Sequence, residues 1–75
     1  MAEFPQLHVG DRVLIYLDPS RWSTSGWLPG NVVRIDPYSD HRNFHWIELD
    51  LPAKTRQGAN MSVVAVLNPK HLRPA

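Results

Sequence analysis

His41 and His45 are the pair of side chains in this chain that most resembles a metal site. They are four residues apart, a spacing that places two ligands side by side on a helix. The surrounding segment alternates like a strand, and on a strand the two residues stand about 13 Å apart, too far to share one ion. The sequence contains no cysteine that could complete a site. We therefore expect neither a metal nor a cofactor.

Two further groups carry residue types that are used in catalysis. Ser39, Asp40 and His41 are the residue types of a hydrolase triad, but neighbouring residues cannot point at one another with triad geometry. Glu48 and Asp50 alternate onto one strand face and form a pair of carboxylates there. We interpret these carboxylates as a solvated exterior face. The expectation is a protein that is not an enzyme.

Aromatic side chains are the strongest candidates for binding. Trp22, Tyr38 and Phe44, with Asp40 as the acid, could enclose a methylated ammonium by cation–π attraction. The alternative is that large aromatic rings fill a small core. A third interpretation needs less demanding geometry, namely a protein-binding groove in which loop aromatics anchor a partner chain. The partner-binding residues that we predict are Trp22, Tyr38, Phe44, Trp46 and Asp40.

Basic residues interleaved with aromatic ones provide the alternative partner, a nucleic acid. The candidate residues for that interface are Arg42, Phe44, Trp46, Lys54 and Arg56. Charge argues against it, because eight Lys and Arg stand against seven Asp and Glu, for a net charge of +1. Asp36, Asp40, Glu48 and Asp50 also lie in the same part of the sequence, where they would repel phosphate. A nucleic acid is therefore the alternative and not the favoured partner.

Short strands separated by proline and glycine must position these side chains. We predict strands over 12–17, from about 27 to 35, over 43–49 and over 61–66, with a turn at 36–40 and a polar loop at 52–60. A 3₁₀ turn at 68–71 should follow, because proline suits a first helical position, and then a brief last strand at 72–73. The residues predicted to face the interior are Val13, Ile15, Val33, Ile35, Ile47, Leu49, Val64, Val66 and Leu72.

The order of these pieces resembles a small barrel of the Src-homology-3 type, in particular its Tudor and agenet branch. The resemblance rests on the entry Val9-Gly10-Asp11-Arg12-Val13, on the strand that begins near Trp27, and on the ending Leu72-Arg73-Pro74. It implies an all-β, five-stranded, Tudor-like barrel with a short 3₁₀ turn near the C-terminus. It also implies that the first loop and the central turn meet at one end of the barrel.

Plasmid-borne, trimethoprim-resistant dihydrofolate reductases share this architecture and the Gly-Asp-Arg-Val entry, here Gly10 to Val13. The active pore of those enzymes depends on a Val-Gln-Ile-Tyr stretch in a late strand. The corresponding stretch here is Val63 to Val66, which has neither the glutamine nor the tyrosine. We therefore reject that activity.

Length and hydropathy complete the expectations. A chain of 75 residues forms one domain, 1–75, with an ordered barrel at about 7–74, and buries only about 60% of its unfolded surface. No apolar run approaches the roughly 18 residues of a membrane span, and the first residues do not resemble a signal peptide, so we expect a cytoplasmic protein and no membrane partner.

The function we predict is a small non-enzymatic binding module or accessory subunit that engages a protein partner through loop aromatics at one end of the barrel. The alternatives are a nucleic-acid-binding barrel and, more remotely, an oligomeric enzyme whose site forms between subunits. A thin core also favours a homo-oligomer in which edge strands add to one another.

Overall fold

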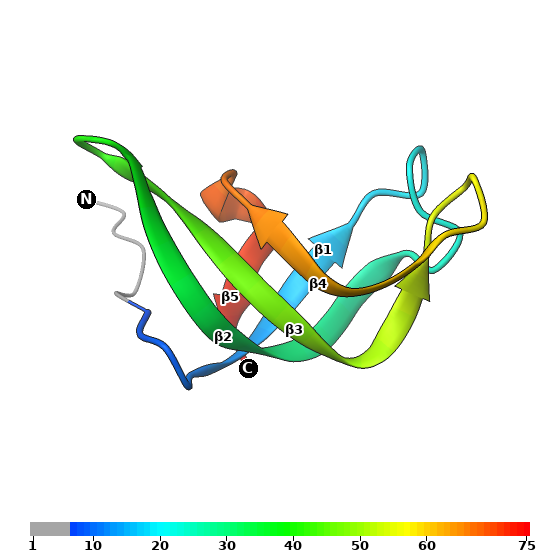
Figure 1. Cartoon of the computed structure of the whole chain (residues 1–75), viewed down its shortest axis with the longest axis horizontal. Coiled ribbons are helices and arrows are strands. Elements are labelled where there is room, and N and C mark those ends of the chain that lie inside the picture. Colours follow the sequence, from blue (N-terminus) through cyan, green and yellow to red (C-terminus); the bar gives the residue numbers. More distant parts are fainter. Residues whose placement is uncertain (1–6) are drawn as a thin grey trace.

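The computed structural model describes residues 7–75, which fold into five β-strands and one 3₁₀ turn (Figure 1). The elements are β1 (Arg12–Leu17), β2 (Gly26–Ser39), β3 (Arg42–Lys54), β4 (Asn60–Val66), η1 (Pro69–His71) and β5 (Leu72–Pro74). The strands form one antiparallel sheet in the order β4-β3-β2-β1-β5. The prediction of an all-β fold is confirmed. Expectations about residues 1–6 lie outside the described part of the chain.

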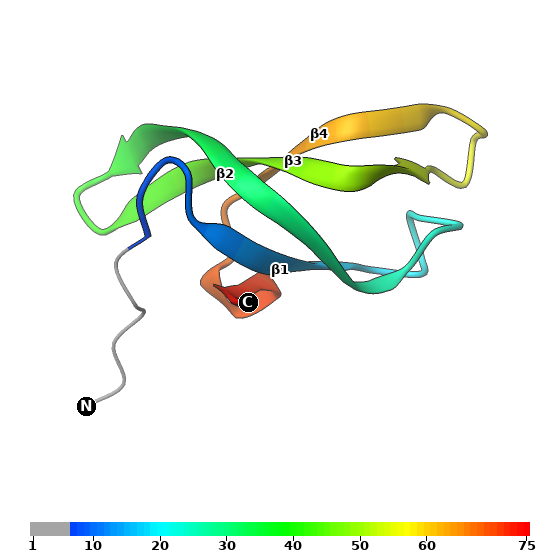
Figure 2. The same cartoon turned by 90° about the horizontal axis from the view of Figure 1, so that it is seen from below.

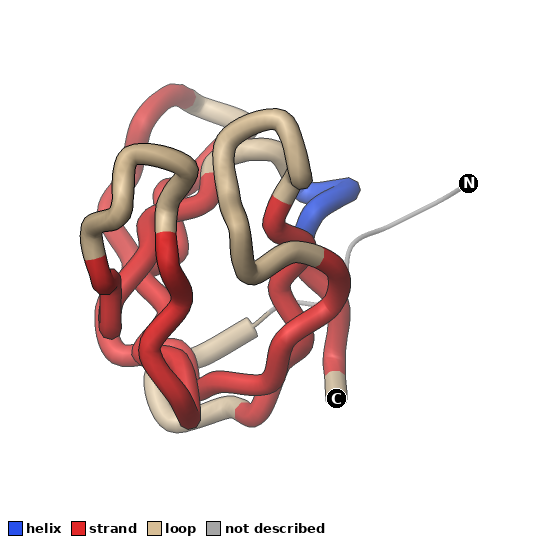
Figure 3. The backbone as a smooth tube through the Cα atoms, turned by 90° about the vertical axis from the view of Figure 1, so that its right-hand side faces the viewer, coloured by secondary structure: helices blue, strands red, loops and turns tan. Residues whose placement is uncertain are grey.

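The sheet is strongly curved. In Figure 2, β3 and β4 lie in one layer, β1 lies in the other, and the long strand β2 crosses between them. Seen along the long axis, the strands wrap around a common interior (Figure 3). The sheet is nevertheless open, because β4 and β5 are its two edges and do not pair with each other. Closure into a barrel is therefore not seen in the strand pairing. Within residues 7–75, no helix has the length and apolar character needed to cross a membrane.

Aliphatic side chains from all five strands fill the interior. Six of the predicted core residues are buried: Val13, Ile15, Ile47, Leu49, Val66 and Leu72. Two others, Ile35 and Val64, are partly buried and pack against this core. Leu17, Val32 and Ala53 complete it. Val13, Ile15 and Leu17 of β1 are all buried because every second residue of a strand faces the same side of the sheet.

Val33 is the wrong prediction among the core residues. It is 41% exposed, whereas its neighbour Val32 is 1% exposed and pairs with Ile47. The next pair along the hairpin is Arg34 with Trp46, so Val33 is an extra residue in β2. Such a bulge interrupts the alternation of the strand, which is why a strict period of two placed Val33 inside.

The hairpin of β2 and β3 is longer than its sequence suggested. Asp36 and Pro37 pair with Phe44 and Asn43, so the predicted turn at 36–40 is largely strand, and the chain reverses only between Ser39 and Arg42. At the other end of the hairpin, β3 continues to Lys54 and so includes the first three residues of the predicted loop 52–60. The two strands therefore form one long arm of the molecule (Figure 1).

The C-terminal segment folds as predicted. Asn68 caps η1 by accepting a hydrogen bond from the Lys70 backbone N–H at 2.9 Å, and Pro69 occupies the first turn. β5 then returns to pair with β1, Leu72 opposite Ile15. On the outside of this pair, the guanidinium carbon of Arg73 lies 4.1 Å from the centre of a Trp27 ring.

Candidate partner-binding surface

The outer face of the β2–β3 hairpin carries three of the predicted aromatic side chains. Phe44 pairs with Asp36 and Trp46 pairs with Arg34, which places all four side chains on one side of the sheet. Tyr38 joins them from the end of β2, with its ring edge-on to Phe44 at a centroid distance of 5.4 Å. We call Tyr38, Phe44 and Trp46 the aromatic hairpin face.

Polar neighbours fix the position of Trp46. Its indole Nε1 donates a 3.0 Å hydrogen bond to Oδ2 of Asp36. The other oxygen of Asp36 accepts a 2.9 Å hydrogen bond from Nε of Arg34, with which it forms an ion pair. Trp46 is half-buried, so its polar atom is satisfied while part of the ring stays accessible.

The aromatic hairpin face remains open to solvent at its tip and continues onto β4. Tyr38 is 61% exposed. Ala65 pairs with Trp46, and Val63, which is 37% exposed, pairs with the next outward residue of β3, Glu48. Apolar side chains from β2, β3 and β4 therefore form one strip across the sheet, the arrangement that marks an interaction surface.

Trp22 lies away from this face. It forms an isolated bridge with Thr55 and packs, half-buried, against the core. Its loop lies beside the loop between β3 and β4, at the end of the molecule opposite the hairpin turn (Figure 1). The expectation that the first loop and the central turn meet at one end is therefore wrong. Trp22, Tyr38 and Phe44 do not enclose a common space, and no aromatic cage forms from them.

The charged residues that were predicted to bind a partner lie at two opposite ends of the molecule, the hairpin turn and the end that carries Trp22. Asp40 lies in the hairpin turn, and Arg42 begins β3 directly after it. Lys54 and Arg56 lie at the opposite end, where the Arg56 backbone N–H donates to the Arg21 carbonyl and the Arg56 Nε donates to the Pro19 carbonyl. The predicted nucleic-acid residues Arg42, Phe44, Trp46, Lys54 and Arg56 thus form no single surface.

Histidines and carboxylates occur in pairs in the part of the chain that the structure describes. Among the residues that the structure describes, no three or more His, Asp or Glu are placed to hold a metal ion. Asp50 accepts two hydrogen bonds of 2.7 Å from Arg12, which hold the pKa of its carboxyl below the ordinary value. Glu48, the other predicted carboxylate, faces outward and is exposed. The carboxylate pair is therefore part of a solvated face, as the sequence indicated.

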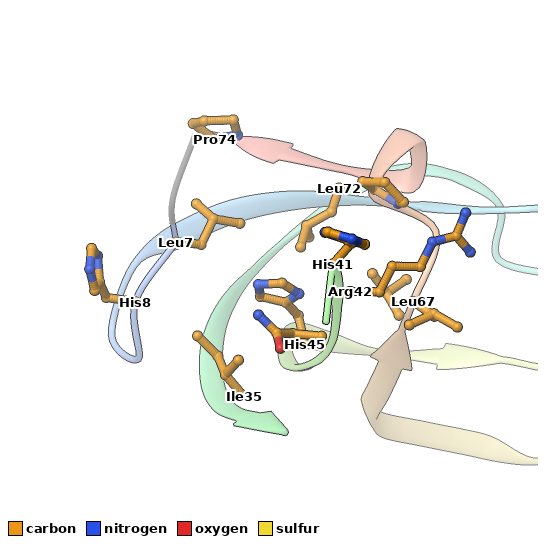
Figure 4. A pocket seen from close by; sticks show the side chains of 12 residues that line it. Leu7, His8, Ile35, His41, Arg42, His45, Leu67, Leu72 and Pro74 are labelled. Atoms are coloured by element: carbon orange, nitrogen blue, oxygen red, sulfur yellow. The ribbon is translucent and has the colours of Figure 1, made fainter. Parts of the chain in front are cut away.

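A cavity on the inner side of the hairpin was not anticipated (Figure 4). Its volume is about 630 Å³, and the segments that line it run from Leu7 and His8 to the hairpin turn and to the C-terminal strand. His45 and Ile35 reach it from β3 and β2, on the side of the sheet opposite Phe44 and Trp46. The alternation of the strands indicated that His45 and Phe44 face opposite sides of the sheet. The cavity itself could not be predicted, because the segments that enclose it are far apart in sequence.

Comparison with models of protein families, with curated proteins and with solved structures finds no match for this chain. The function must therefore be argued from the geometry of these surfaces.

Proposed function

We propose that the protein is a small non-enzymatic binding module that engages a protein partner through the aromatic hairpin face. The observation that carries this proposal is the exposure of Tyr38, which is held edge-on against Phe44 at the tip of the hairpin. Aromatic side chains that remain exposed beside an apolar strip are enriched where proteins bind one another.

Rigidity supports the same proposal. Trp46 is held by Asp36 and Arg34, and Phe44 is held between Asp36 on the paired strand and the ring of Tyr38. Side chains that are already ordered lose little conformational entropy when a partner covers them. The aromatic hairpin face therefore offers buried area at a low entropic cost.

The order of the elements supports the resemblance of the sequence to small Src-homology-3-type barrels. A four-strand meander is followed by a 3₁₀ turn and a fifth strand that returns to β1. We propose that the open sheet is a Tudor-like variant of that barrel, with the hairpin of β2 and β3 as its binding element. The methylated-ammonium interpretation is not carried forward, because the rings that it required are separated.

The test is affinity capture followed by mass spectrometry, with three forms of the full chain. The double variant Tyr38→Ser/Phe44→Ser removes the exposed rings, and Leu51→Ser changes an exposed leucine of β3 outside the aromatic hairpin face. We expect the wild type and Leu51→Ser to retain the same protein partner, and the double variant to retain at least about tenfold less of it. Dispersed amide spectra for all three forms establish that each is folded.

Equal capture by all three forms contradicts the proposal. Capture of nucleic acid in place of protein, with retention that falls steeply as salt is raised, supports the alternative instead. A partner that proves to be a second copy of this chain, bound only while Tyr38 and Phe44 are intact, assigns the aromatic hairpin face to a homo-oligomer.

A further inference from the structure

The inner cavity at the hairpin end has the size and position of a small-molecule site. Its volume of about 630 Å³ lies within the range of ordinary ligand pockets. It opens between the hairpin turn, the start of the described chain and the C-terminal strand (Figure 4).

Among residues 7–75, the ionisable side chains that line the cavity are all basic. They are His8, His41, Arg42 and His45, and no carboxylate from this part of the chain lines the cavity. Asp11 contacts His8 at 3.8 Å, so this histidine already has an acidic neighbour. Arg42 takes part in no ion pair within residues 7–75. Its guanidinium is therefore available to an anion from outside the chain.

The rest of the wall is largely apolar. Ile35, Leu72 and Leu7 contribute side chains to it; Figure 4 shows Leu7 and Ile35 on the side of the cavity away from Arg42, and Leu72 beside His41. A ligand that contacts both the basic side chains and the apolar wall would carry a negative group and an apolar body. Imidazole and guanidinium N–H groups would donate to the oxygens of such a ligand, as charged hydrogen bonds are the stronger ones.

We propose that this cavity binds a small amphipathic carboxylate, with the carboxylate at Arg42, His41 and His45 and the apolar body against Ile35 and Leu72. The site is independent of the proposed protein-binding function, because Phe44 and Trp46 point to the opposite side of the hairpin from His45. Failure of partner capture and failure of carboxylate binding can therefore be distinguished from each other.

The experiment is a nitrogen-15 NMR titration of the full-length protein with 1-naphthoate and, separately, with 1-naphthalenemethanol. The two probes share the apolar body and differ in charge. We expect 1-naphthoate to shift the amide signals of residues around 41–45 and 66–72, and the alcohol to bind at least about tenfold more weakly. This comparison uses only the wild-type protein, so it does not depend on the folding of a variant.

Two variants then test whether Arg42 binds the carboxylate of 1-naphthoate. Arg42→Gln should weaken 1-naphthoate binding about tenfold, because a hydrogen bond to a charged group is lost. Arg56→Gln, a matched change at the opposite end of the molecule, should leave the dissociation constant unchanged. Equal affinity for the two probes, no shifts among the lining residues up to the solubility of 1-naphthoate, or an unchanged affinity in Arg42→Gln would each overturn the proposal.

Discussion

Trp46 and Asp36 are joined by a 3.0 Å hydrogen bond across the β2–β3 hairpin, from the indole Nε1 to Oδ2. The residues are ten positions apart in sequence, and the bond ties the indole to a carboxylate that Arg34 holds in turn. It fixes the orientation of the Trp46 ring within the aromatic hairpin face. A partner would meet a surface whose shape exists before binding.

Asp36→Ala should release this indole. We expect the Trp46 Nε1–H signal to shift and to exchange faster with water, and the free energy of unfolding to fall by about 1 kcal/mol. Asp40→Ala is the matched control, because Asp40 lies exposed in the adjacent turn. An unchanged Trp46 signal in Asp36→Ala would show that the hydrogen bond does not hold the ring.

Asp50→Asn should reduce the dependence of stability on pH. Hydrogen bonds from Arg12 lower the pKa of Asp50 in the folded state, so the pair contributes stability above the unfolded-state value of about 3.9 and loses it as pH falls through the folded value. The variant should be slightly less stable at neutral pH, since an exposed pair contributes little. Between about pH 5 and pH 2, its stability should fall less steeply than that of the wild type.

Urea unfolding at a series of pH values measures this difference. Glu48→Gln serves as the control, because Glu48 is exposed on the same strand and forms no ion pair within residues 7–75. Identical pH profiles for Asp50→Asn and the wild type would be incompatible with a lowered pKa at Asp50.

Gly30→Ala should destabilise the sheet where Gly30 of β2 lies close against β3. A Cβ at this position would lie 2.6 Å from the Glu48 carbonyl oxygen and 2.8 Å from Cγ2 of Ile47. The backbone must shift to relieve these contacts, so we expect a loss of about 1–3 kcal/mol in urea unfolding. Ser62→Ala, at an exposed position of β4, should change stability by less than about 0.5 kcal/mol. Equal stabilities of the two variants would contradict the close approach.

Arg73→Gln should loosen the last strand. Arg73 lies over the Trp27 ring, and such a contact at an exposed site stabilises by about 0.5–1 kcal/mol. The amide of Ala75 donates to the Arg12 carbonyl at 3.2 Å, and its exchange with water reports on the docking of β5. Exchange should become faster in Arg73→Gln and stay unchanged in Lys70→Gln. If both variants exchange like the wild type, the Trp27–Arg73 contact contributes nothing to docking.

Local sequence signals predicted much of the fold. The alternation of Val13, Ile15 and Leu17 defined β1, and proline after Asn68 defined the 3₁₀ turn. Signals of this kind depend on residues that are close in sequence. The bulge at Val33 has no such signal, because it is a shift in the pairing of β2 with a strand further along the chain, and the prediction failed there.

The candidate site depended more on long-range contacts and was predicted less completely. Tyr38, Phe44 and Trp46 share one surface because of the register of a single hairpin. Trp22 was expected beside them, but its position is set by a bridge to Thr55, more than thirty residues away. The inner cavity combines both ends of the described chain with the hairpin turn, so no stretch of sequence could indicate it.

The measurement that tests the central claim most directly is the map of amide shifts when the captured protein partner is added to nitrogen-15-labelled protein. The account predicts the largest changes at Tyr38, Phe44 and Trp46 and at their neighbours Val63 and Ala65 on β4. Changes confined to the opposite end, around Arg21, Trp22 and Arg56, would contradict it.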